Sequence, residues 1–92
     1  MLEAPECPAG TMPVLLSGEA GGTMVHEACG HGLEADIIQK DYSVYRGKIG
    51  SRVASPLVTL VDDGSIPDLL GSSRWDDEGT PCGRTVLIEK GI

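Results

Sequence analysis

Apolar residues recur with helical spacing in one segment of the chain, between positions 21 and 33. The apolar side chains that can share one face of a helix here are Met24, Val25, Ala28 and Leu33. Gly30 and Gly32 weaken this helix, and Gly32 can cap its C-terminal end. The pattern therefore predicts one helix, preceded by a glycine-rich turn over residues 17–22.

Short apolar runs elsewhere in the chain predict strands, because turn residues bound each run. The expected strands lie at 14–16, 42–45, 53–61, 68–71 and 85–89. Asp62-Asp63-Gly64 predicts a turn directly after the third of these strands. Apart from residues 42–45, the polar segment 36–52 is expected to be a loop, and residues 76–81 an acidic turn.

The connections between the expected strands are short, which favours antiparallel pairing. We therefore predict an α+β fold, in which one helix packs on a mostly antiparallel sheet of short strands. Residues 1–13 contain Pro5, Pro8, Gly10 and Pro13, and we expect them to form an extended lead-in. The folded unit is expected to cover residues 14–92.

The composition limits the size of the core. A chain of 92 residues is long enough for one domain and too short for two. It contains no Phe, one Trp and two Tyr, so the core must be aliphatic. With 13 Gly and 6 Pro, the chain should form many turns and short elements. Such a fold would be only marginally stable alone, which indicates that it is part of a larger domain.

The chain is acidic, with 14 Asp and Glu against 7 Lys and Arg and a formal net charge of −7. The basic residues are scattered, so we expect no direct binding to nucleic acid and none to an anionic membrane surface. No apolar run approaches the roughly 20 residues that span a bilayer. The acidic, proline-broken start does not resemble a signal peptide. Cys7, Cys29 and Cys82 lack CxxC spacing, which is typical of free thiols in a reducing cytosol.

The two histidines of the chain belong to one motif. The segment from His26 to His31 has the pattern HExxxH, in which Glu27 follows the first histidine. Imidazole nitrogens bind divalent metals, above all zinc, and a neighbouring carboxylate can act as a general base. We therefore predict that His26 and His31 bind Zn²⁺. Glu27 would take a proton from the metal-bound water and pass it to the leaving amine.

The spacing of this motif sets a condition on the backbone. Histidines at i and i+4 lie about 40° apart around a helix, whereas histidines at i and i+5 lie about 140° apart. His26 and His31 can reach one metal only if the helix contains a π-type turn or loosens after Cys29. A departure from helical geometry costs least at Gly30. The sequence therefore predicts a helix irregularity between the two histidines.

Two histidines do not complete a catalytic zinc site, which usually has three protein ligands. The nearby candidates for a further ligand are Cys29, Glu34, Asp36 and Cys82, and none stands out by its spacing. The alternative is that His26 and His31 are structural residues of a non-catalytic interaction module. Glu27 favours the metal site, because a structural pair has no need of an unligated carboxylate beside it.

Three other patterns could carry chemistry. The Gly-rich segment 18–22 precedes a helix, but it lacks the Gly-Lys-Ser/Thr ending of a phosphate loop, and Glu19 would repel phosphate. Cys29 could pair with a histidine as a nucleophile, although a small core thiol is the simpler interpretation. Asp76-Asp77-Glu78 could bind a cation or the amino terminus of a substrate, and a solvated turn is the alternative.

Taken together, these segments resemble the TldD half of the TldD/PmbA metallopeptidase family, whose members are also labelled modulators of DNA gyrase. The resemblance rests on residues 7–10 (CPAG), 26–36 (HEACGHGLEAD), 61–64 (VDDG), 76–81 (DDEGTP) and 86–91 (VLIEKG). They occur in the family's order over nearly the whole chain.

The resemblance implies a cytoplasmic metal-dependent protease that hydrolyses unfolded or extended polypeptides. It implies a heterodimer with a homologous PmbA/TldE-like subunit and no contact with DNA. His26 and His31 then correspond to zinc ligands and Glu27 to the catalytic base, while the third ligand, a cysteine, lies outside this chain. Because the acidic turn is among the segments that carry the resemblance, a role at the site is also implied for Asp76, Asp77 and Glu78.

Members of this family are several hundred residues long. The resemblance therefore implies that residues 14–92 are the HExxxH-containing portion of a TldD-like C-terminal catalytic domain. It also implies that this stretch is inactive by itself, because the third ligand is missing.

Overall fold

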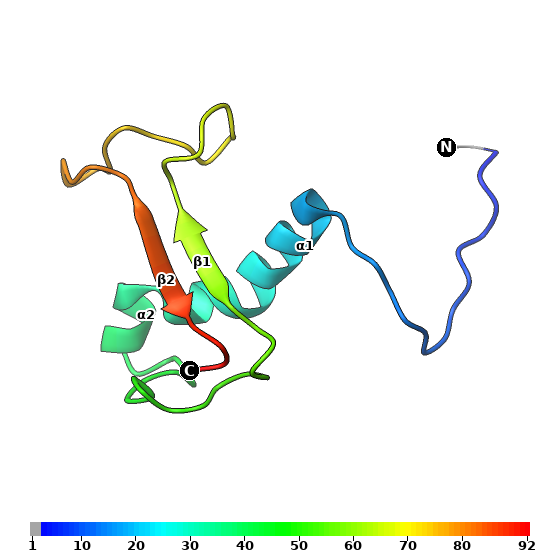
Figure 1. The fold of residues 1–92 in the computed structure, drawn as a ribbon, viewed down its shortest axis with the longest axis horizontal. Coiled ribbons are helices and arrows are strands. Elements are labelled where there is room, and N and C mark those ends of the chain that lie inside the picture. Colours follow the sequence, from blue (N-terminus) through cyan, green and yellow to red (C-terminus); the bar gives the residue numbers. More distant parts are fainter. Residues whose placement is uncertain (1–2) are drawn as a thin grey trace.

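The computed structural model describes residues 3–92 and places two helical segments before two strands (Figure 1). α1 covers Gly18–Val25 and runs directly into a π-helical turn, η1 (His26–Gly30), and a 3-10 turn, η2 (His31–Leu33). A second helix, α2, covers Ala35–Gln39. β1 (Leu60–Asp63) pairs with β2 (Arg84–Ile88) in a two-stranded antiparallel sheet. The fold is α+β, as predicted.

α1 begins earlier than predicted because Ser17 caps it. Ser17 has an extended backbone, with φ −63° and ψ 155°, and its hydroxyl accepts a hydrogen bond from the Ala20 N–H at 3.3 Å. This bond satisfies one of the free N–H groups in the first turn of the helix. Glu19 adds a negative charge in that turn, where the helix dipole favours it. The predicted glycine-rich turn is therefore helical from Gly18 onward.

α2 lies in a segment that we predicted to be a loop. An ion pair at 2.9 Å joins Lys40 Nζ to Asp36 Oδ2 across one helical turn. The helix ends before Asp41, whose φ of 63° lies in the left-handed region. The prediction was wrong here because five residues are too few to show a helical period.

The sheet has an irregular register. Val61, Asp62 and Asp63 pair with Val86, Thr85 and Arg84, whereas Leu60 pairs with Ile88. The register shifts between Leu60 and Val61, as at a β-bulge. The strand predicted at 85–89 thus forms one residue earlier, and the turn predicted at 62–64 starts only at Gly64.

Three predicted strands do not form. Residues 14–16 are extended and exposed, and their arm runs away from the rest of the chain (Figure 1). Residues 42–45 lead into a turn over residues 44–47, in which the Arg46 N–H donates to the Ser43 carbonyl. Asp68 has a φ of 62°, which is incompatible with a strand at 68–71. An apolar run becomes a strand only where another strand pairs with it, and no described segment pairs with these.

The core is small and aliphatic. Among the described residues, Ile88 is the one buried apolar side chain, with 4% of its surface exposed. The radius of gyration is 16.5 Å, against about 12 Å for a compact domain of this length. Large apolar side chains such as Leu15, Ile49 and Leu70 are almost fully exposed. The described residues therefore bury far less apolar surface than a typical domain does.

The C-terminal turn holds the loop that precedes β1. The Gly91 carbonyl accepts hydrogen bonds from the N–H groups of Val53 (2.8 Å) and Ala54 (3.2 Å). The Gly91 N–H donates to the Val58 carbonyl at 2.9 Å. Part of the segment 53–61, which we predicted to be a strand, is thus a loop tied to the end of the chain. This contact fixes where β1 begins beside β2.

Candidate metal centre

The HExxxH motif forms one cluster on the surface. Side-chain ligand atoms of His26, Glu27 and His31 all lie within 4.8 Å of one another, and all three residues are exposed. The imidazole centroids of the two histidines are 4.4 Å apart, with an angle of 65° between the ring planes. Two imidazoles at this distance can supply two nitrogen ligands to a zinc ion, and the carboxylate of Glu27 lies beside them. The residues present therefore fit a divalent metal ion.

The π-turn creates this cluster. The His31 N–H donates to the His26 carbonyl, which is the i→i+5 bond of a π-helix. One extra residue is thus accommodated within a single turn, and the second histidine lies above the first. The predicted helix irregularity between the two histidines is confirmed.

Gly30 lies in the π-turn without an unusual backbone conformation. Its φ of −58° and ψ of −50° are ordinary helical values. A Cβ atom at this position would lie 3.4 Å from His26 Nδ1. This is an ordinary van der Waals distance, so a small side chain would also fit beside the imidazole of His26.

Glu27 lies close to the second histidine. Its Oε2 atom is 3.6 Å from His31 Nε2, and its side chain is 67% exposed. A carboxylate at this distance can accept a proton from a water molecule held between it and the histidines.

A second carboxylate contacts His31 from the other side of the ring. Glu34 Oε1 lies 2.8 Å from His31 Nδ1. This hydrogen bond, followed by the negative charge of Glu34, raises the pKa of His31 above its ordinary value. Glu27 makes a smaller contribution in the same direction. The two imidazole nitrogens therefore face two different carboxylates.

None of the further ligand candidates joins the cluster within residues 3–92. The neighbouring Cys29 thiol raises the pKa of the Tyr45 phenol. Asp36 pairs with Lys40, which lowers the pKa of the Asp36 carboxyl. Glu34 is held at His31, as described above, and Cys82 lies near Gly64 at the end of β1. The structure would have to rearrange before any of these four residues could act as a third protein ligand of the metal.

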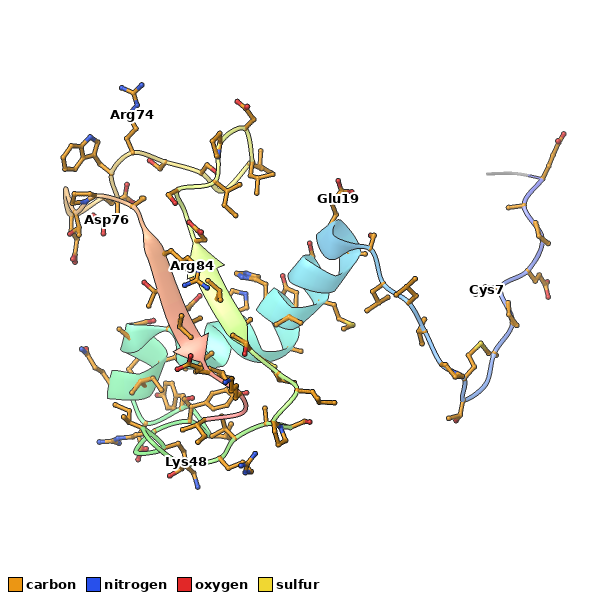
Figure 2. The ribbon with its side chains drawn as sticks, viewed as in Figure 1. Cys7, Glu19, Lys48, Arg74, Asp76 and Arg84 are labelled. Carbon is orange, nitrogen blue, oxygen red and sulfur yellow. The ribbon has the colours of Figure 1, made fainter. Side chains whose placement is uncertain are left out.

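The acidic turn lies in the loop between the strands. Asp76 Oδ1 accepts hydrogen bonds from the N–H groups of Glu78 (2.9 Å) and Thr80 (2.8 Å). A bridge between Trp75 and Pro81 closes the turn. Figure 2 shows Asp76 at the end of the sheet away from Lys48 and the α2 side of the molecule. In this position the Asp76 carboxylate stabilises its own turn, and the metal-ligand cluster does not include it.

A groove of about 660 Å³ runs between the motif and the sheet. Val25, His26 and Leu33 line it on the helical side, and Leu60, Val61 and Leu87 line it on the strand side. The first histidine is thus accessible from a largely apolar depression. Within residues 3–92, no helix has the length and apolar character needed to cross a membrane.

Known proteins share these features of sequence. The family described as PmbA/TldA metallopeptidase C-terminal domain matches residues 9–92. A metalloprotease TldD homolog from Haemophilus influenzae is 52% identical over 91 residues, which are 99% of this chain and 19% of that protein. A metalloprotease from Methanocaldococcus jannaschii is 45% identical over 92 residues, which are 100% of this chain and 20% of that protein. The chain thus spans about a fifth of the length of these relatives.

Proposed function

The chain belongs to this family of metallopeptidases, and we propose that it carries the zinc-binding motif of a peptidase subunit that hydrolyses unfolded or extended polypeptides. One observation carries the proposal. The π-turn brings His26, Glu27 and His31 to within 4.8 Å of one another, on the surface and beside a groove. An exposed cluster of this kind suits a site that must admit both a metal ion and a substrate.

Each residue of the motif has one role. His26 and His31 bind the zinc ion through neutral imidazole nitrogens. When bound, zinc supplies Lewis acidity, which polarises a carbonyl group and lowers the pKa of water. Glu27 takes the proton from the attacking water at its carboxylate and delivers it to the nitrogen of the leaving amine. The distance of 3.6 Å between Glu27 Oε2 and His31 Nε2 supports this role.

The third zinc ligand in this proposal is a cysteine outside the chain. The relatives are about five times as long as this chain, so they contain ample sequence to supply it. The 92 residues would then be part of a TldD-like C-terminal catalytic domain and inactive by themselves. Their large exposed apolar surface agrees with this, because such a surface normally packs against further protein.

The groove supports the proposed substrate class. β1 is one strand of a two-stranded sheet, and residues of β1 line the groove beside His26. An extended peptide can add to a free strand edge through main-chain hydrogen bonds, which require no particular sequence. We further propose a cytoplasmic location and a homologous PmbA/TldE-like partner subunit.

Substitution of Glu27 tests the function. In the full-length subunit with its partner, Glu27→Gln should retain zinc and lose cleavage of an unstructured peptide. His26→Ala should lose both. Asp36→Asn is a matched control, because Asp36 is an exposed carboxylate outside the cluster and pairs with Lys40. If Glu27→Gln cleaves the peptide normally, the motif is not the active site and the non-catalytic interaction module becomes the better interpretation.

A further inference from the structure

Glu34 contacts the second histidine of the motif and has no role in the function proposed above. Its Oε1 atom is 2.8 Å from His31 Nδ1, the shortest polar contact that the structure shows for the histidine ring. The two side chains are about half exposed, at 53% for His31 and 47% for Glu34. Attraction between exposed charges contributes little to stability. We therefore expect the contact to set the orientation of the ring and the nitrogen that carries its proton, and to add little to the stability of the fold.

The backbone accounts for this contact. His31 begins the 3-10 turn η2, and the Glu34 N–H donates to the His31 carbonyl at 3.3 Å. A 3-10 helix has three residues per turn, so the side chains at i and i+3 lie one above the other. The π-turn thus places His31 over His26, and the 3-10 turn that follows places Glu34 over His31.

The hydrogen bond determines which nitrogen of His31 is free. A carboxylate can only accept hydrogen bonds, so Nδ1 must carry the proton that joins it to Glu34. In the neutral imidazole the lone pair is then on Nε2. This is the nitrogen 3.6 Å from Glu27 Oε2, on the side of the ring that faces the proposed base.

We propose that Glu34 is a positioning residue that holds His31 in its Nδ1–H form, so that Nε2 is the metal-binding nitrogen. The part of this inference that concerns metal rests on the proposed function. Carboxylates that accept a hydrogen bond from a ligating histidine fix the orientation of the ring and increase its basicity. Glu34 is therefore assigned to support the metal site and not to bind the metal.

The first test measures the tautomer of His31 in the metal-free full-length subunit. Comparison with the spectrum of a His31→Gln variant identifies the imidazole signals of His31. Long-range proton–nitrogen NMR at about pH 9, where imidazole is neutral, distinguishes the two tautomers. We expect the Nδ1–H form in the wild type and the Nε2–H form, which free histidine prefers, in Glu34→Ala. Glu34→Gln should restore the Nδ1–H form, because an amide oxygen also accepts a hydrogen bond.

The second test measures zinc affinity in the full-length subunit. Loss of a carboxylate partner typically weakens metal binding about 10–100-fold, and we expect a loss of this size for Glu34→Ala. Glu34→Gln should lose less, and the control Asp36→Asn should bind zinc as the wild type does. Circular dichroism of each variant checks that the helices are intact.

The outcomes separate the two proposals. If wild-type His31 is in the Nε2–H form, or if Glu34→Ala binds zinc as tightly as the wild type, the role of Glu34 is overturned while the peptidase proposal stands. If the wild-type subunit does not bind zinc, the proposed function fails. In that case the tautomer measurement alone decides whether Glu34 positions His31.

Discussion

Replacing Gly91 by alanine should strongly destabilise the chain, because the C-terminal turn has no space for a side chain. A Cβ atom at this position would lie 2.5 Å from the Ala54 carbonyl oxygen and 2.7 Å from that of Ser55. Both are backbone atoms, so neither can rotate away. In addition, Gly91 has a φ of 85°, in the left-handed region that side chains disfavour.

The expected loss can be worked out from two contributions. A left-handed backbone conformation costs about 1–2 kcal/mol for a residue with a Cβ. Relief of the clash would also displace the hydrogen bonds of Gly91 with Val53, Ala54 and Val58, each worth about 1 kcal/mol. The sum is about 4–5 kcal/mol. Typical domains unfold with about 5–15 kcal/mol, and this chain buries far less apolar surface than a typical domain, so the loss is a large share of its total stability.

Urea unfolding of the chain, followed by circular dichroism, measures this loss. Gly47→Ala is the control, because Gly47 also has a left-handed φ, of 70°, but nothing lies within 4 Å of its Cβ position. We expect about 1–2 kcal/mol for Gly47→Ala. Equal losses at the two positions would refute the steric argument. If Gly91→Ala is unfolded without urea, the expectation is met only when Gly47→Ala remains folded.

Two further substitutions probe the site and the sheet. Gly30→Ala should favour the helix by up to about 1 kcal/mol and leave zinc binding in the full-length subunit unchanged, because the new Cβ would lie at an ordinary contact distance, 3.4 Å, from His26 Nδ1. Calorimetric titration with zinc checks this, and a clear loss of affinity would mean that the imidazole needs the space beside Gly30. Ser65→Ala should raise the pKa of Asp63, because the Ser65 hydroxyl, at 2.6 Å, and its N–H, at 3.0 Å, lower that pKa. The lowered pKa stabilises the fold above the ordinary carboxyl pKa, and this contribution disappears as the pH falls through the folded value. A carboxyl NMR titration that shows the same Asp63 pKa in both proteins would contradict the assignment.

The motif was predictable in its geometry as well as in its residues. The distance of five residues between His26 and His31 leaves few backbone solutions if both bind one metal, and the π-turn is the one that the structure contains. The contact of Glu34 with His31 was not predictable in the same way. It depends on the 3-10 turn over His31–Leu33, and a three-residue turn leaves no periodic signal in the sequence.

The sheet was predicted only in part, for a physical reason. β2 was predictable because its apolar residues follow each other directly and turns bound them. Residues 14–16 have a similar pattern, yet they form no strand among the described residues. An apolar run indicates that a segment can pair, whereas pairing itself depends on a partner far away in the sequence. The exposed arm in Figure 1 illustrates that dependence.

The π-turn also bears on the apolar residues of the helical segment. We predicted a face of Met24, Val25, Ala28 and Leu33; Val25 and Leu33 line the groove, whereas Met24 and Ala28 are exposed. Val25 directly precedes the π-turn, and Leu33 ends the 3-10 turn that follows it. The short segment that brings the two histidines together therefore also connects the two helical residues of the apolar wall beside them. Deletion of one residue from this turn would disturb the wall and the metal site together.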